Sequence, residues 1–525
     1  MNMDRTAANA INGAKRKEIL VLSLCVIIGF SLRFYTFDQK SLWLDEVHTF
    51  NDSRDGFKAQ IEFYKENPTY LHPPLFFVLT HLFYPFEKPE RDLRLIPLIF
   101  GILSVPMIYL LSKSFSPQIA LPCTLSLTFM VYHIYFSQEA RPYSMLMFLG
   151  MVALYFFILY LRTSRRIYLF LAPIFFALLF HTSYTAIPFI LFSQILWFSN
   201  IRDDNQPPST SSFFVFNGLL VLFCMAWLLF VAFSYRGQPM MDPHHTEDPG
   251  SLWSIVYWIL NDWVSNLPLI IVSVILLVLF PFFSKHKKDA LTLLALLICP
   301  VGSLYLFSKF SDITHFFASK YFITLLPLFF ISIYLALNAI EIKFKRLRHF
   351  MRLKLLFAIF LIASNLLTLP FYYRSEKQDF KGLATCLKDQ LRDGDNIFVR
   401  TKAYIPGILH YFGAYPKGRH HVVSFSKDEE KGIEYVLGSA DPRKMFTIYN
   451  SIKCCTQYVG DGSRLWIIVE KGTAKEFTKH SPCVLKGYFD GSVANFRKFP
   501  TDASMYLFLW DPKTPDEKGI EMSIE

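Results

Sequence analysis

The sequence carries little charge for its length. Only 18% of its 525 residues are Asp, Glu, Lys or Arg, whereas a soluble protein of average composition has about 25%. Hydrophobic residues make up 53% of the chain and aromatic residues 17%. Apolar runs of about 17–25 residues, long enough to cross a bilayer, recur through most of the chain before residue 373. This composition excludes an ordinary soluble protein and indicates a polytopic membrane protein.

Familiar cofactor motifs are also lacking. The part of the chain after residue 373 has no P-loop, GxGxxG turn or Cys/His metal spacing, and the pairs His244–His245 and His420–His421 have no recognisable ligand frame. This part contains four cysteines, namely Cys386, Cys454, Cys455 and Cys483. They are compatible with two disulfides, in any of three connectivities, and equally with inert buried thiols.

Eleven apolar segments are predicted to span the membrane. They cover about residues 19–37, 95–111, 119–136, 143–161, 167–183, 184–199, 213–233, 267–283, 290–307, 321–340 and 355–371. The fifth and sixth spans are divided at HTSYT (181–185), because this division places the strongest basic clusters on one side of the membrane. Those clusters are AKRK (14–17), RTSRR (162–166), SKHKK (284–288) and KFKRLR (343–348).

The distribution of positive charge predicts the orientation. Loops on the side of these clusters hold 18 Lys and Arg residues, whereas the short loops on the other side hold 4, namely Arg141, Arg236, Lys309 and Lys320. The positive-inside rule therefore predicts a cytoplasmic N-terminus. The net charge of +11 then needs no nucleic-acid partner. Residues 1–18 lack a cleavable signal pattern, so we expect the first apolar run to remain as a span.

The loops and the C-terminal part complete the predicted organisation. Residues 38–94 form a long outer loop, in which HPPLFFVLTHLFYPF (72–86) is too short to cross and is expected to be an interfacial or re-entrant helix. We divide the chain into an all-α transmembrane domain, residues 1–373, and an extracytoplasmic soluble α/β domain, residues 374–525. The helix candidate of the second domain is DFKGLATCLKDQL, and its strand candidates are NIFV, FTIYN, RLWIIVE and MYLFLW. We expect this domain to act as a lid, an acceptor-docking module or a partner module.

Polar residues collect at the outer ends of the spans and in the outer loops. Few charges fall at the predicted midplane of a helix, which argues against an ion or proton pathway. Arg33, near the outer end of the first span, is expected to extend its guanidinium outward to water. The outer polar set is Asp45, Glu46, His48, His72, Arg94, Glu139, Arg141, Tyr143, His181, Tyr184, Lys320 and Tyr321.

This set predicts an outward-facing cavity in which carboxylates and cations face each other. Such a pairing suits group transfer from a phosphate-bearing lipid whose tail stays in the bilayer. Cations and a tyrosine hydroxyl would hold the phosphate. A carboxylate would take a proton from the attacking hydroxyl or amine.

Ordered motifs resemble a known family. LWLDE (42–46) resembles the first outer loop of the GT-C glycosyltransferases, on the branch of the polyprenyl- or dolichyl-phosphate-mannose protein mannosyltransferases and the lipid A aminoarabinose transferase. HPPLFF (72–77) is similar to the His/Lys-Pro-Pro-Leu element of that branch. Four further blocks follow in the family's order: RLIPLIFGILSVPMIYLL (94–111), SQEARPYSMLMF (137–148), SKYFITLLPLFF (319–330) and DFKGLA (379–384).

The resemblance implies a membrane glycosyltransferase that takes a sugar from a polyprenyl-phosphate donor to a glycan, lipid or protein acceptor at the outer face, as in lipopolysaccharide or protein glycosylation. Asp45 corresponds to the expected catalytic base, and Glu46 would support it or orient the acceptor. Direct displacement would invert the anomeric configuration. The implied donor-binding set is His72, Arg94, Arg141, Tyr143, Lys320 and Tyr321. A bacterial inner membrane is the implied setting, with an endoplasmic reticulum as the alternative.

The chain departs from the family at two positions. Position 72 is His where the aminoarabinose branch has Lys, so its charge depends on pH. Lys320 stands where Arg is usual and lacks its bidentate phosphate geometry. The resemblance assigns no cofactor. Some relatives carry a metal near the active site, and His244, His245 and Glu247 would be candidates for a divalent metal here.

Each candidate also has an ordinary structural explanation. Asp45 and Glu46 suit the N-terminal end of a short helix, and His72 suits a helix start before two prolines. Span-end anchoring would account for Arg94, Arg141 and Lys320, and an aromatic belt for Tyr143 and Tyr321. Packing at a hairpin turn would account for His181 and Tyr184.

Two other function classes remain open. The first is a transporter or flippase for a lipid-linked sugar, although no internal repeat of the kind common in transporters is found. The second is a non-catalytic scaffold for envelope assembly.

Overall fold

The computed structural model describes residues 2–53, 55–66, 68, 70, 72–199, 209–235, 250–311, 317–344, 352–416, 433–437, 445–449, 463–480, 483–493, 501–514, 518–522 and 524. The chain divides into two compact units. The first comprises residues 1–38, 52–370 and 495–499, and the second comprises residues 39–51, 371–494 and 500–525. The second unit therefore includes part of the first predicted outer loop.

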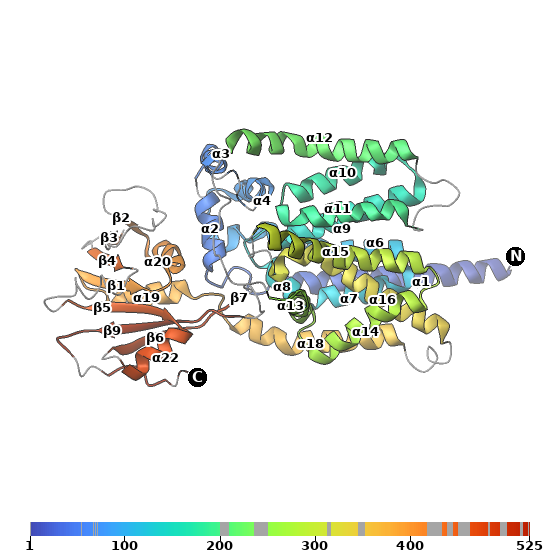
Figure 1. Ribbon diagram of the computed structural model, residues 1–525. Helices are drawn as coiled ribbons and strands as arrows, with labels where there is room; N and C mark the ends of the chain where they lie inside the picture. The colour runs from blue at the N-terminus through green and yellow to red at the C-terminus, as the bar shows by residue number, and fades with distance from the viewer. Residues whose placement is uncertain are drawn as a thin grey trace. The chain divides into compact units, whose positions relative to one another are not determined.

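The described part of the first unit is helical (Figure 1). Before the first long apolar helices it contains α1 (Asn2–Phe34), the end of α2 (Leu44–Ser53), α3 (Phe57–Glu66), α4 (Leu75–Thr80), η1 (His81–Phe83) and α5 (Pro89–Asp92). The bundle continues with α6 (Leu95–Phe115), α7 (Pro117–Thr128), α8 (Val131–Ser137), α9 (Tyr143–Thr163), α10 (Arg166–Phe180), η2 (Tyr184–Ala186), α11 (Ile187–Ser193), η3 (Gln194–Phe198) and α12 (Thr210–Ser234). It ends with α13 (Leu252–Val264), α14 (Leu267–Phe283), α15 (Lys287–Ser311), η5 (Ser319–Leu325), α16 (Leu326–Lys343) and α18 (Leu353–Arg374), the last of which extends into the second unit.

Apolar sequence explains which of these helices can cross a membrane. Among the described residues six helices are long and apolar enough, and eight if each of two bent pairs counts as one span. The predicted count of eleven is not reproduced by this criterion. The apolar run of α1 between Glu18 and Arg33 is short, and so are the apolar helices Arg166–Phe180 and Tyr184–Phe198. The chain is nevertheless an integral, multi-pass membrane protein.

Local sequence signals account for several boundaries. The division at HTSYT occurs as predicted, because α10 ends at Phe180 and the next helical turn begins at Tyr184, after Ser183 caps it through the backbone N–H of Thr185. The HPP motif also starts a short helix as predicted, with Pro74 at the N-cap of α4. The sequence analysis missed α13, which precedes α14 with a bend of 114°.

The second bent pair, α7 and α8, explains the buried Arg33. The two helices meet at a bend of 63°, where carbonyl groups leave the helical ladder. Arg33 donates hydrogen bonds to the carbonyls of Leu127 (2.9 Å) and Thr128 (3.1 Å), and its guanidinium lies 2.7 Å from Nδ1 of His133. The expectation that Arg33 reaches outward to water is wrong, since its side chain is fully buried. It satisfies backbone oxygens instead.

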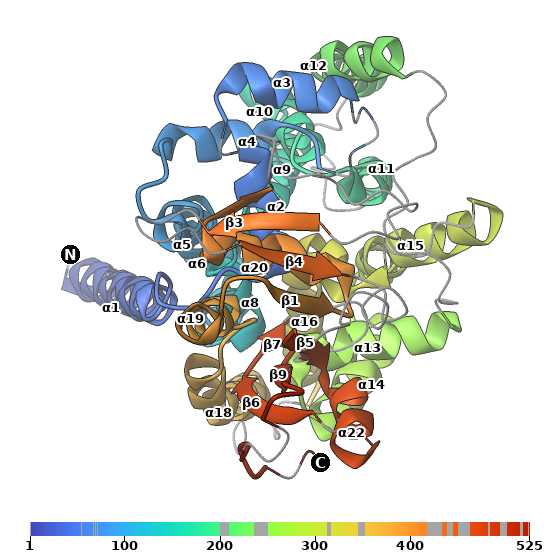
Figure 2. The same cartoon turned by 90° about the vertical axis from the view of Figure 1, so that its left-hand side faces the viewer.

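The second unit contains a seven-stranded mixed sheet in the order β2-β3-β4-β1-β5-β9-β6 (Figure 2). Central β1 runs parallel to β4 and β5, and the outer pairings are antiparallel. The strands are β1 (Asp395–Val399), β2 (Ala414–Pro416), β3 (Ile433–Leu437), β4 (Met445–Tyr449), β5 (Leu465–Glu470), β6 (Val484–Phe489) and β9 (Met505–Trp510), and a separate pair is formed by β7 (Ser492–Val493) and β8 (Thr501–Asp502). The predicted C-terminal α/β character is confirmed.

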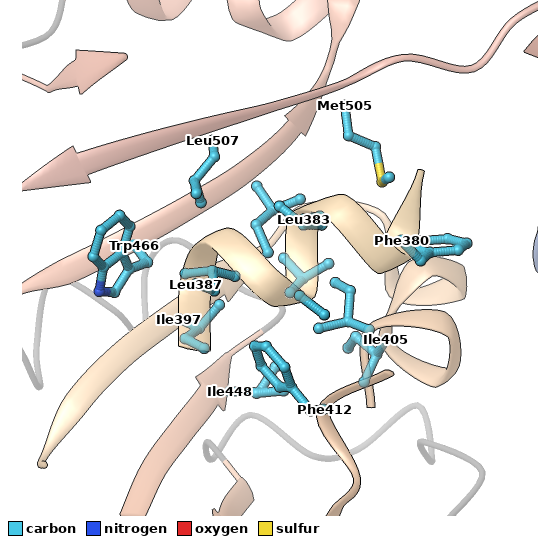
Figure 3. Packing of buried hydrophobic residues seen from close by; sticks show 14 of the residues in the cluster. Phe380, Leu383, Leu387, Ile397, Ile405, Phe412, Ile448, Trp466, Met505 and Leu507 are labelled. Atoms are coloured by element: carbon cyan, nitrogen blue, oxygen red, sulfur yellow. The ribbon is translucent and has the colours of Figure 1, made fainter. Parts of the chain in front are cut away.

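Helices cover this sheet because their apolar faces match its buried strands. The helical elements are α19 (Phe380–Gln390), η6 (Lys402–Tyr404), α20 (Ile405–Phe412) and α22 (Lys471–His480). Phe380, Leu383 and Leu387 of α19 pack with Ile397 and Trp466 of the sheet (Figure 3). Burial of each such side chain contributes about 1.5–3 kcal/mol.

The DFKGLA motif starts α19. Asp379 is its N-cap and accepts a hydrogen bond from the backbone N–H of Gly382 at 2.7 Å. A Cβ atom at position 382 would lie 2.2 Å from a carboxyl oxygen of Asp379. The Asp and the Gly of this motif therefore have a structural explanation, which is a capped helix start with the carboxylate close to the backbone.

Candidate functional site

Four of the predicted donor-binding residues lie together in the first unit. Tyr143 begins α9, and its ring centroid is 6.1 Å from that of Tyr321 and 6.2 Å from that of His72. Lys320 Nζ lies 5.5 Å from the ring centroid of Tyr143 and 5.6 Å from that of Tyr321. The ammonium group thus contacts two aromatic rings, an arrangement that stabilises a desolvated cation.

The position of His72 is fixed by its backbone. Its carbonyl accepts a hydrogen bond from the hydroxyl of Tyr64 at 3.0 Å. The two prolines that follow direct the chain into α4, and the backbone N–H of Leu75 donates to the carbonyl of His181 at 3.1 Å. His181 and His72 therefore belong to neighbouring segments, and the imidazole of His72 is buried.

A further polar group, missed in the sequence, lies beside His72. The hydroxyl of Tyr70 donates a hydrogen bond to Asp52 Oδ2 at 3.1 Å and also hydrogen-bonds Arg141. The Tyr70 ring makes an edge contact with His72 at 6.2 Å between centroids. Asp52, Tyr70 and Arg141 therefore extend the cluster around His72.

The electrostatics of this group follow from burial. Burial raises the pKa of the Asp52 carboxyl to about 7, against the opposing effects of the Tyr70 hydrogen bond and the positive charge of Arg141. Burial, together with the nearby Asp52, also raises the pKa of Tyr70. Asp52 is thus a carboxyl group that titrates near neutral pH, in the range suited to proton transfer.

Lys320 is carried by a segment held through buried hydrogen bonds. The hydroxyl of Tyr132 donates to Ser319 Oγ at 2.9 Å, and Ser319 donates to Asp262 Oδ2 at 2.6 Å. All three side chains are buried. The network ties α8 and α13 to η5, in which Lys320 and Tyr321 lie. Asp262 was missed because α13 was not predicted.

Arg94 lies at a different structural position. It is the N-cap residue of α6, its side chain is fully buried, and one Nη–H group donates to the carbonyl of Phe37 at 3.0 Å. This contact ties the start of α6 to the segment that follows α1.

The predicted catalytic pair belongs to the second unit. Asp45 and Glu46 occupy the first turn of α2, where acidic residues are favoured by the helix dipole. Glu46 is fully buried, accepts a hydrogen bond from the backbone N–H of Trp43 at 3.3 Å and forms an ion pair with Lys377 at 3.3 Å. The Asp45 side chain is half-buried.

The other sequence candidates are distributed as follows. His244, His245, Glu247, Cys454 and Cys455 lie outside the described residues. Within the described ranges no group of three His, Cys, Asp or Glu side chains is arranged to hold a metal ion. Cys386 has a free thiol, whose Sγ accepts a hydrogen bond from Gln390. Tyr184 accepts a hydrogen bond from Trp227 Nε1 at 2.6 Å, which fits a packing role.

Known proteins resemble this chain in sequence and in fold. Residues 71–232 match the family model described as dolichyl-phosphate-mannose-protein mannosyltransferase. The crystal structure of ArnT from Cupriavidus metallidurans in the apo state aligns over 95% of this chain and 98% of its own, with 11% identity and a TM-score of 0.54. The chain therefore shares the fold of ArnT.

A second crystal structure of ArnT from Cupriavidus metallidurans contains undecaprenyl phosphate. It aligns over 94% of this chain and 98% of its own, with 11% identity and a TM-score of 0.54. No curated protein matches the sequence. At this identity the structural match establishes a shared fold, and the family model covers three of the resembling motifs, namely HPPLFF, RLIPLIFGILSVPMIYLL and SQEARPYSMLMF.

Proposed function

We propose that this chain is a membrane glycosyltransferase that transfers one sugar from a polyprenyl phosphate to a glycan, lipid or protein acceptor. The observation that carries the proposal is the group formed by Lys320, Tyr143, Tyr321 and His72, which occurs in a fold shared with ArnT. ArnT, which shares the fold, binds undecaprenyl phosphate. A buried ammonium flanked by aromatic rings suits a lipid phosphate monoester, since little water competes with the anion.

In the proposed reaction an acceptor hydroxyl or amine attacks the anomeric carbon. Asp45 takes the proton of the attacking group, and the bond between the anomeric carbon and the phosphate oxygen breaks. The electron pair leaves with the polyprenyl phosphate, whose negative charge Lys320, Arg141, Arg94 and His72 would stabilise together with the hydroxyls of Tyr143 and Tyr321. A single displacement inverts the configuration of the sugar.

Glu46 takes a supporting role in this proposal. Its carboxylate is buried against Lys377 and the Trp43 N–H, so it serves the helix that carries Asp45. The reaction as written needs no metal ion, and a divalent ion bound by His244, His245 or Glu247 would be an addition to it.

We further propose eleven membrane passages. Six long helices and two bent pairs account for eight passages, and α1, Arg166–Phe180 and Tyr184–Phe198 account for the other three. The basic loops favour a cytoplasmic N-terminus, with the C-terminal α/β module in the periplasm of a bacterial inner membrane.

The test uses purified protein in lipid and a panel of radiolabelled polyprenyl-phosphate sugars. The wild type should release label from one donor, and Asp45→Asn should do so at least about 100-fold more slowly while still binding that donor. Equal release by both proteins would place the base elsewhere. Binding of a donor without release by the wild type would favour the flippase, and absence of both release and binding across the panel would favour the scaffold.

A further inference from the structure

The segment that carries Asp45 is held by residues more than 300 positions away in the sequence. Within the second unit, Lys40 Nζ donates to the carbonyls of Tyr372 and Ser375 and lies 4.0 Å from the centroid of the Tyr372 ring. The backbone N–H of Ser41 donates to Glu376 Oε2 at 3.0 Å. Residues 40 and 41 are thereby attached to the end of α18 and the turn after it.

The next residues along the two segments continue this attachment. Glu46 and Lys377 form an ion pair at 3.3 Å in which both side chains are buried, with exposed fractions of 0% and 1%. The backbone N–H of Leu44 donates to Gln378 Oε1 at 3.0 Å. The three consecutive residues 376–378 therefore contact Ser41, Glu46 and Leu44, which lie just before α2 or in its first turn.

These contacts decide where α2 begins. The first N–H groups of a helix have no partner within the helix and need other acceptors. Here Glu46 accepts from Trp43, and Gln378 accepts from Leu44. With both N–H groups satisfied by side chains, the helix starts at Leu44, and the direction of the Asp45 side chain is set one residue later.

The buried ion pair between Glu46 and Lys377 restricts the geometry of this attachment. Removing either partner leaves an uncompensated buried charge, so the two charges need each other to remain ionised. An apolar contact would tolerate sliding of α2, whereas the Glu46 carboxylate must remain within reach of the Lys377 ammonium. The pair therefore fixes the position of the helix along its contact with residues 376–378.

We propose that Lys377 and Gln378 are positioning residues that hold the first turn of α2 and so orient Asp45. The expected effect on kcat rests on the proposed function, whereas the expected effect on hydrogen exchange does not. The inference assigns the C-terminal module a role in orienting the proposed catalytic base. A role limited to covering the site or docking an acceptor would not require a buried ion pair with Glu46.

The experiment compares Lys377→Met with Lys381→Met in the full chain in lipid. Lys381 is an exposed lysine four residues further on, and its backbone N–H contact to Ser41 does not depend on its side chain. Hydrogen exchange of the segment 41–50 should become at least 10-fold faster in Lys377→Met and stay at the wild-type rate in Lys381→Met. The rate constant kcat should fall at least 10-fold with the donor KM within a factor of two, and Lys377→Arg should restore most of it.

Gln378→Ala provides the second variant, because it removes one hydrogen-bond acceptor and no charge. Gln378→Ala should raise the rate of hydrogen exchange at the first turn of α2. It therefore tests the inference even if Lys377→Met does not fold. Wild-type exchange of 41–50 in Gln378→Ala and in any folded Lys377→Met would overturn the inference. If the wild type transfers no sugar but exchange changes as stated, the proposed function fails while the attachment of α2 stands.

Discussion

Tyr70 and Asp52 are joined by a hydrogen bond of 3.1 Å, although neither residue belongs to a motif that predicted the site. Tyr70 also contacts His72 and Arg141, so this bond connects a titratable carboxyl to the proposed donor-binding residues. We therefore expect a change in the charge of Asp52 to alter its electrostatic interaction with Arg141.

Asp52 should give the protein a specific dependence of stability on pH. Its pKa is about 7 in the folded protein and near 3.8 in an unfolded chain. Between these values the folded state holds a proton that the unfolded state has released, so the contribution of Asp52 to stability falls as pH rises from about 4 to 7. Asp52→Asn should be more stable relative to wild type at pH 8 than at pH 5, as measured by thermal unfolding in detergent. Asp55→Asn, an exposed control, should show no such difference, and equal behaviour of the two variants would contradict the assignment.

Arg33 should contribute strongly to the stability of the bundle. Arg33→Leu leaves the carbonyls of Leu127 and Thr128 without these donors at the bend between α7 and α8. We expect a loss of about 3 kcal/mol, seen as a lower thermal midpoint. Arg33→Lys keeps the charge but reaches fewer acceptors and should lie in between. A thermal midpoint for Arg33→Leu equal to that of the wild type would show that the carbonyls of Leu127 and Thr128 find other hydrogen-bond donors.

Two glycine substitutions should have opposite effects. A Cβ on Gly101 of α6 would lie 2.2 Å from Ser137 Oγ, so Gly101→Ala should destabilise the protein by about 1–3 kcal/mol. Gly302 in α15 has open space around the same position, and Gly302→Ala should stabilise the protein by about 0.5–1 kcal/mol. Thermal unfolding of both variants checks the packing of α6 against α8. A stable Gly101→Ala would mean that the two helices are further apart.

Lys320 should contribute to donor binding through its charge. Lys320→Met should raise the Kd for a polyprenyl-phosphate donor about 10-fold or more, because the phosphate loses a desolvated cation. Lys320→Arg should retain binding, since guanidinium also contacts phosphate and aromatic rings. Lys309→Met, at an exposed lysine, serves as the control for a general loss of charge. Unchanged affinity in Lys320→Met would remove this residue from the proposed donor site.

Hydropathy and local motifs predicted much of the fold because they depend on neighbouring residues. The break at HTSYT, the helix start at HPP and the strand RLWIIVE are each encoded in a few consecutive side chains. The prediction failed at α13, because Asn261 and Asp262 interrupt its apolar face. It also failed at Arg33, whose partners are carbonyl groups about 95 residues away.

Some residues of the candidate site were predicted from local motifs, and others were not. Sequence motifs alone pointed to Asp45, His72, Arg141 and Lys320, because the resemblance preserves short blocks around them. Asp52, Tyr70 and Asp262 were not predicted, since each acquires its role from a partner outside its own segment.

The sequence by itself determined the membrane class, most helices and the C-terminal α/β character, because burial of apolar side chains in lipid or against a sheet follows local periodicity. Only the tertiary structure decided that Glu46 pairs with Lys377, that Arg33 bonds carbonyls and that Lys320 lies against Tyr143. These contacts join residues that are distant in the chain, and their energies arise from desolvation and hydrogen bonding that exist only after the segments have packed together.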